Sequence, residues 1–67
     1  MGQQKTLMRK LRRDQDLTLE FVSRKTGVPV STVSRVERLR MKPSENVEKR
    51  LVKFFKTPVE QLLEMVA

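Results

Sequence analysis

Residues 17–38, which read LTLEFVSRKTGVPVSTVSRVER, constrain the fold of this chain more than any other segment. Gly27 and Pro29 interrupt the segment between two stretches that can form helices. Glycine favours the left-handed turn that ends a helix, and proline favours the first turn of the next one. Apolar residues recur so that one side of such a pair can be buried: Leu17, Val22, Val28, Val33 and Val36. The segment therefore predicts two short helices that pack through a shared face.

Start and stop signals place this pair and predict a helix before it. We expect a first helix over residues 4–13, with Leu7, Met8 and Leu11 on its apolar side. Thr18 is a good N-cap for a second helix, which continues to about Lys25. The third helix is expected over residues 29–38.

Two further helices follow a cationic loop at residues 39–43. Ser44 is expected to cap a fourth helix over residues 45–55. Thr57 as N-cap, with proline next and Glu60 three residues on, predicts a capping box that starts a fifth helix. Its apolar residues are Val59, Leu62, Leu63 and Val66. We therefore predict one compact all-α domain of five helices over residues 1–67, with its core at about 7–66 and no strand.

Composition narrows the function before any motif is considered. The chain has no cysteine and no histidine, which excludes a disulfide framework, a cysteine nucleophile and a Cys/His zinc site. Because it also lacks a glycine-rich phosphate loop and a substrate-sized core, we expect no enzyme, cofactor, metal or small-molecule substrate. Its apolar runs are too short for a membrane span. We expect a cytoplasmic protein.

The charge balance indicates a polyanionic partner. Lys and Arg number 15 against 8 Asp and Glu, for a net charge of +7, and nucleic acid is the commonest partner of such a chain. A merely solvated basic surface is the alternative. Residues 57–67 carry only Glu60 and Glu64 as charged side chains, so this tail is better suited to a subunit contact than to DNA.

The third predicted helix carries the residues suited to nucleic acid. Its outward side holds Ser31, Thr32, Ser34, Arg35 and Arg38. Hydroxyl and guanidinium groups reach phosphates and base edges, and a helix of this size fits the DNA major groove.

These residues resemble the Cro/C1-type (Xre) helix-turn-helix family, which includes the N-terminal domains of lambdoid phage repressors. The resemblance covers residues 8–64, and its most specific part is STVSRVE at residues 31–37. It implies a bacterial or phage-encoded regulator of repressor type that reads double-stranded DNA with its third helix. Because one such domain reads few base pairs, a homodimer on a palindromic operator is expected.

The resemblance assigns roles residue by residue. Base edges would be read by Val30, Ser31, Thr32 and Arg35, and Arg35 can donate two hydrogen bonds to guanine. Phosphate contacts are expected from Thr18, Ser34, Arg12, Arg38, Arg40 and Lys42. Arg12 is also expected to pair with Glu37 and so brace the third helix. The alternative is an ordinary surface ion pair, worth under about 1 kcal/mol.

The chain departs from the family at two kinds of position. Leu19 stands where a DNA-contacting glutamine is common, and Phe21 where a polar residue is usual, so both are candidates for a protein interface. Leu63, Met65 and Val66 are candidates for a subunit contact. An antitoxin or adaptor module that binds protein through this fold is therefore the alternative function. At three positions where the family usually ends a helix with glycine, this chain has other residues, namely Asp16, Leu39 and Lys56.

Overall fold

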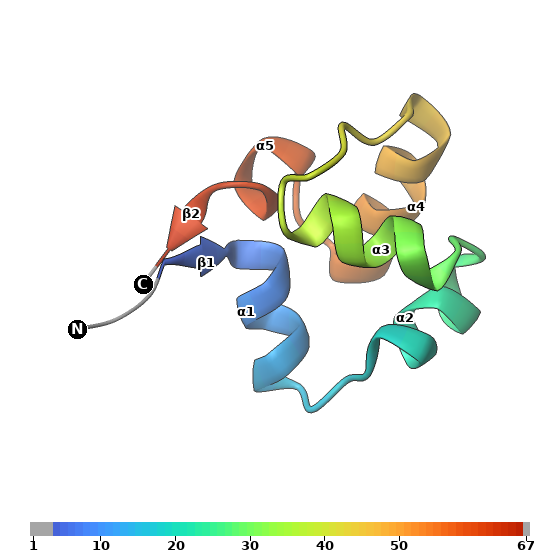
Figure 1. The fold of residues 1–67 in the computed structure, drawn as a ribbon, viewed down its shortest axis with the longest axis horizontal. Coiled ribbons are helices and arrows are strands. Elements are labelled where there is room, and N and C mark those ends of the chain that lie inside the picture. Colours follow the sequence, from blue (N-terminus) through green and yellow to red (C-terminus); the bar gives the residue numbers. More distant parts are fainter. Residues whose placement is uncertain (1–3, 67) are drawn as a thin grey trace.

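The computed structural model describes residues 4–66 and shows five α-helices and one small strand pair (Figure 1). The elements are β1 (Lys5–Thr6), α1 (Leu7–Asp14), α2 (Leu19–Thr26), α3 (Val30–Glu37), α4 (Glu45–Phe55), α5 (Val59–Leu62) and β2 (Met65–Val66). The predicted all-α fold of five helices is confirmed, apart from the strand pair. None of the helices within residues 4–66 is long and apolar enough to cross a membrane.

The capping signals of α2 and α4 act as predicted. The Thr18 hydroxyl accepts a hydrogen bond of 3.0 Å from the Phe21 amide, and the Ser44 hydroxyl accepts one of 3.3 Å from the Val47 amide. Gly27 ends α2 in the left-handed region, with φ of 77°. The third helix is shorter by one residue at each end than predicted, because Pro29 is its N-cap and Arg38 its C-cap.

The N-terminal segment differs from the prediction. The first helix begins at Leu7 and not at residue 4, because the Thr6 hydroxyl caps it by accepting from the Arg9 amide at 3.3 Å. Lys5 and Thr6 instead pair antiparallel with Val66 and Met65, respectively. The expectation of no strand is therefore wrong. This pair joins the two ends of the described chain, as Figure 1 shows.

The predicted capping box at the fifth helix is also wrong. The Thr57 hydroxyl donates a hydrogen bond of 3.0 Å back to the Phe55 carbonyl, so it does not cap the helix that follows. Pro58 is the N-cap of α5 and makes no side-chain cap bond. The helix consists of one turn, and Val66, which the sequence predicts in this helix, lies in β2.

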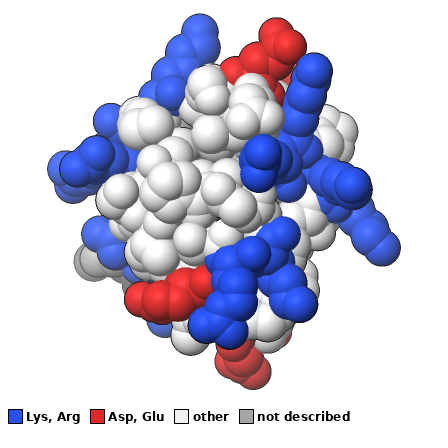
Figure 2. Space-filling view, turned by 90° about the vertical axis from the view of Figure 1, so that its right-hand side faces the viewer, with Lys and Arg blue, Asp and Glu red and all other residues white. Residues whose placement is uncertain are grey.

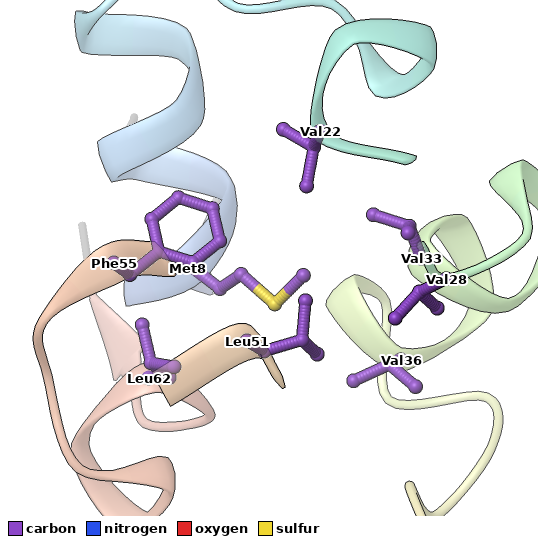
Figure 3. Packing of buried hydrophobic residues seen from close by; sticks show 8 residues of the cluster. All are labelled: Met8, Val22, Val28, Val33, Val36, Leu51, Phe55 and Leu62. Carbon is purple, nitrogen blue, oxygen red and sulfur yellow. The ribbon is translucent and has the colours of Figure 1, made fainter. Parts of the chain in front are cut away.

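Every helix contributes to one apolar core, shown in Figure 3. The buried apolar side chains are Met8, Val22, Val28, Val33, Val36, Leu51, Phe55 and Leu62. Burial of a side chain of this kind stabilises a fold by roughly 1.5–3 kcal/mol. Because Val33 and Val36 hold one side of α3 against this core, the opposite side of α3 faces outward.

Candidate nucleic-acid interface

The turn between α2 and α3 is fixed by hydrogen bonds to its backbone. The buried Thr26 hydroxyl donates to the Val22 carbonyl at 2.7 Å and accepts from the Val28 amide at 3.2 Å. From α4, Arg50 Nη1 donates to the Thr26 carbonyl at 2.9 Å. A Cβ added at Gly27 would lie 2.5 Å from this same nitrogen. Glycine therefore allows both the left-handed turn and the approach of Arg50.

The outward side of α3 carries hydroxyl groups and one guanidinium. Ser31 and Arg35 are exposed, whereas Val30, Thr32 and Ser34 are half-buried. The single carboxylate of this helix, Glu37, is only 1% exposed. The exposed side of α3 is therefore free of negative charge, which favours an approach to phosphates.

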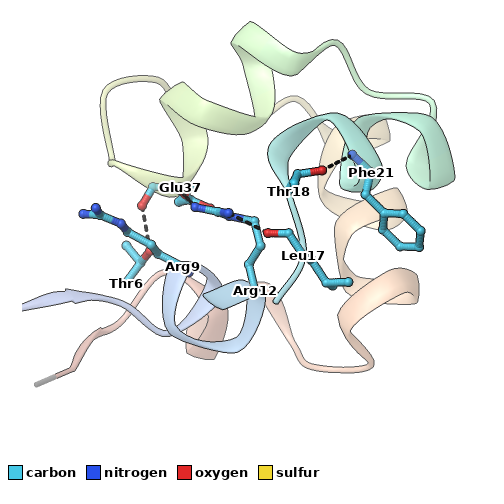
Figure 4. Close-up of polar contacts among 7 residues, drawn as sticks. All are labelled: Thr6, Arg9, Arg12, Leu17, Thr18, Phe21 and Glu37. Carbon is cyan, nitrogen blue, oxygen red and sulfur yellow. Dashed lines mark hydrogen bonds and ion pairs between the residues drawn. The ribbon is translucent and has the colours of Figure 1, made fainter. Parts of the chain in front are cut away.

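Arg12 of α1 and Glu37 of α3 form a two-bond ion pair (Figure 4). Arg12 Nε donates to Glu37 Oε1 at 2.7 Å, and Nη2 donates to Oε2 at 3.1 Å. The remaining guanidinium nitrogen, Nη1, donates to the Leu17 carbonyl at 2.8 Å. The Arg12 side chain is 14% exposed, so this pair is not the ordinary surface pair considered as the alternative. It links the end of α3 to α1 and to the segment that precedes α2.

Sequence reasoning missed the part that Thr6 takes in this anchor. Thr6 is only 2% exposed, and its hydroxyl donates a hydrogen bond of 2.6 Å to the Glu37 carbonyl. A threonine next to a basic helix predicts only an N-cap, and this bond joins residues 31 positions apart. Glu37 is thus held by both its side chain and its backbone.

Four of the residues expected to contact phosphates lie outside α3 and outside the Arg12–Glu37 pair. Arg38, Arg40, Lys42 and Thr18 are all exposed. Arg38 and Arg40 also line a cavity of about 230 Å³ with Lys5 and Arg9. Arg9 Nε is buried there without a hydrogen-bond partner. Lys5 and Arg9 therefore join Arg38 and Arg40 in one basic pocket, which sequence reasoning missed.

Figure 2 shows the side of the molecule that carries the α2–α3 turn and the start of α4. Uncharged surface occupies its centre, and Lys and Arg side chains project around it, with fewer Asp and Glu at the edges. Such a border of cations gives this side of the molecule a positive field.

The residues expected at protein interfaces do not form one surface. Leu19 is half-buried and packs against the core, so it offers less free apolar surface than the interface hypothesis needs. Phe21 is 38% exposed and Met65 is 48% exposed. Leu63 and Val66 are half-buried, and Leu63 packs against the core.

The three non-glycine helix ends adopt the conformation that glycine would favour. Asp16, Leu39 and Lys56 have φ of 56°, 59° and 56°. After α3, the Leu39 amide donates to the Val36 carbonyl at 3.0 Å and the Arg40 amide to the Arg35 carbonyl at 2.8 Å. These two bonds are those of a Schellman turn.

A helix-turn-helix family matches residues 8–62, which include all of α2 and α3. The chain belongs to the Cro/C1-type helix-turn-helix family. This DNA-binding regulator is thus built on the unit that the sequence predicts. Comparisons with curated proteins and with solved structures gave no significant match.

Proposed function

We propose that this helix-turn-helix protein is a sequence-specific regulator of repressor type that reads double-stranded DNA with α3. The exposed side of α3, which has cationic and hydroxyl groups and no exposed carboxylate, is the observation that carries the proposal. A helix with that side in the major groove can contact base edges. We assign the protein no enzymatic role.

Within this proposal, Arg35 is the main base reader. It is exposed on α3, and its guanidinium can donate to O6 and N7 of one guanine. Ser31, Thr32 and Val30 make the neighbouring base contacts. Phosphates are contacted by Thr18, Ser34, Arg12, Arg38, Arg40 and Lys42. Arg12 contributes chiefly by holding Glu37, because all three guanidinium nitrogens already donate to protein oxygens.

Selection from a pool of random duplexes, followed by fluorescence anisotropy on the selected site, tests this assignment. Arg35→Ala should weaken the selected site by roughly ten- to hundredfold and random DNA much less. Arg40→Ala should weaken both alike and reduce the salt slope by about one. Lys49→Ala is the matched control, because Lys49 is an exposed cation on α4 outside the proposed surface. Equal losses on both DNAs for Arg35→Ala would exclude its base-reading role.

The proposed homodimer has an apolar surface beside α5. Leu39, Met41 and Leu63 line one groove of about 370 Å³, and Leu39 and Met41 are 49% and 36% exposed. Exposed Met65 lines the neighbouring cavity with Arg38 and Arg40. A contact here would place the subunit interface next to the loop that follows α3. It would thereby fix the spacing of the two reading helices on a palindrome.

Sedimentation equilibrium tests the dimer without DNA. Met41→Glu places a carboxylate on an exposed part of the groove and should weaken self-association by at least tenfold. Glu48→Lys changes charge on α4 at a residue that does not line the groove, and it should leave self-association unchanged. A wild-type chain that stays monomeric at high concentration, and that also binds a selected palindrome without cooperativity, would rule out the dimer.

A further inference from the structure

A second surface lies between α2 and α4 and shares no residue with the proposed DNA contacts. Lys25 and Thr26 of α2 and Arg50, Lys53 and Phe54 of α4 line an open groove of about 630 Å³. We call it the α2–α4 groove. Its volume falls within the range of about 300–1,000 Å³ that is typical of ligand sites.

Phe54 is the apolar residue that lines this groove, and the exposed Phe21 packs beside it. The Phe21 and Phe54 rings meet edge to face, with centroids 6.5 Å apart. Phe54 packs in the same way on Phe55, at 4.9 Å, and Phe55 belongs to the core. The exposed Phe21 ring is therefore held in place through Phe54, which means that this apolar surface is fixed before a partner binds. A fixed surface loses little conformational entropy on binding.

The charged part of the groove is entirely cationic. Lys25 Nζ lies 5.5 Å from the centroid of the Phe21 ring. Arg50 is positioned by its bond to the Thr26 carbonyl and by a bond of 3.4 Å from Nε to Asn46 Oδ1. Within residues 4–66, neither these two cations nor Lys53 forms an ion pair with a carboxylate. The positive charge of the groove is thus uncompensated inside the chain.

We propose that the α2–α4 groove binds an acidic segment of another protein that carries one apolar anchor residue. The anchor packs beside Phe21 and Phe54, and the carboxylates of the segment pair with Lys25, Arg50 and Lys53. A protein segment fits better than single-stranded nucleic acid, which needs open ring faces for base stacking. Here Lys25 covers one face of Phe21, and Phe54 packs edge to face with both neighbouring rings. Because the groove shares no residue with the proposed DNA contacts, the protein can bind such a partner and DNA at the same time.

The probe for this proposal is a synthetic 12-residue peptide, about half of it glutamate, with one central leucine. It is titrated into isotope-labelled full chain and followed by NMR. Amide shifts should concentrate at the α2–α4 groove. Replacing the leucine of the peptide by serine, or its glutamates by glutamines, should each weaken binding by about tenfold or more.

Matched variants of the chain separate this site from general charge attraction. Lys53→Glu should weaken peptide binding about three- to tenfold, and Phe21→Ser by a similar factor. Lys49→Glu makes the same charge change on the same helix outside the groove, and it should weaken binding less than twofold. Circular dichroism of each variant confirms that it is folded.

Three results would overturn the proposal: equal losses in Lys53→Glu and Lys49→Glu, peptide shifts centred on α3, or tighter binding of a thymidine oligonucleotide in the groove. The first two indicate unspecific charge attraction, and the third indicates nucleic acid as the occupant. The titration contains no DNA, so this proposal and DNA recognition by α3 can fail independently.

Discussion

The turns before and after α3 have similar backbone conformations but are built from different residues. Each has a left-handed residue, Gly27 before the helix and Leu39 after it, with φ of 77° and 59°. Glycine adopts this conformation without strain, whereas leucine does so at a cost of about 1–2 kcal/mol. The turn before α3 lies against α4 through Arg50. The turn after α3 exposes Leu39 and is followed by exposed cations.

The turn before α3 therefore has a structural role, whereas the turn after α3 places side chains on the surface. The first fixes α3 against α2 through a small residue and satisfied backbone groups. The second keeps a strained apolar residue on the surface, at the edge of the proposed subunit contact. Its position is maintained by the polar anchor around Glu37, where Arg12 and Thr6 both bind.

The largest effect is expected from Glu37→Ala, which removes the anchor after α3. Arg12 would then lose two hydrogen bonds while it stays mostly buried, and breaking such a pair costs about 3–5 kcal/mol. Urea denaturation measures the lost free energy of unfolding. Asp14→Ala, which breaks the exposed pair with Lys10, is the control and should lose under about 0.5 kcal/mol. If the two variants lost similar amounts, the end of α3 would not depend on the anchor.

The second effect concerns the turn before α3. Gly27→Ala should lower the free energy of unfolding by about 1–2 kcal/mol through backbone strain, with a further loss if Arg50 must move from the Thr26 carbonyl. Thermal and urea denaturation measure this loss. In an Arg50→Ala background only the strain remains, so Gly27→Ala should then cost less. An equal cost in both backgrounds would show that Arg50 adapts without losing its bond.

Local capping residues predicted the helices well where the cap depends only on nearby chain. Thr18, Gly27 and Ser44 act as expected, and α4 has its predicted bounds. The cap predicted at Thr57 is absent because a threonine hydroxyl can either accept from an amide of the next helix or donate to a carbonyl of the preceding one. Here it donates to the Phe55 carbonyl. The strand pair of Thr6 with Met65 was beyond prediction, because two residues show no alternating pattern.

The candidate site was predictable to the extent that a sequence motif carries it. The α2–α3 unit and the partners of the Arg12–Glu37 pair followed from family resemblance. The different fates of Leu19 and Phe21 did not, because the second helix offers no sign of which side α4 covers. The packing of Phe21 on Phe54 depends on how two separate helices meet. The basic pocket with Arg9 likewise depends on the end of α3 lying beside α1.

The smallest effect is a gain, expected from Leu39→Gly in the turn after α3. Relief of the left-handed strain should raise the free energy of unfolding of the monomer by about 0.5–1 kcal/mol, after the entropy of glycine in the unfolded chain is subtracted. Loss of the exposed side chain should at the same time weaken self-association. Urea denaturation at low protein concentration measures the first change, and sedimentation equilibrium measures the second.

Lys56→Gly is the control for this last variant, because Lys56 is left-handed with φ of 56° at the end of α4, outside the proposed subunit contact. It should gain similar stability, since the same strain is relieved, but its self-association should match that of the unmodified chain. A loss of stability in Leu39→Gly alone would mean that the Leu39 side chain packs within the monomer. Equal self-association in both variants would mean that Leu39 takes no part in the dimer. If Leu39→Gly gains stability and alone loses self-association, the Leu39 side chain contributes to the dimer while its left-handed conformation destabilises the turn.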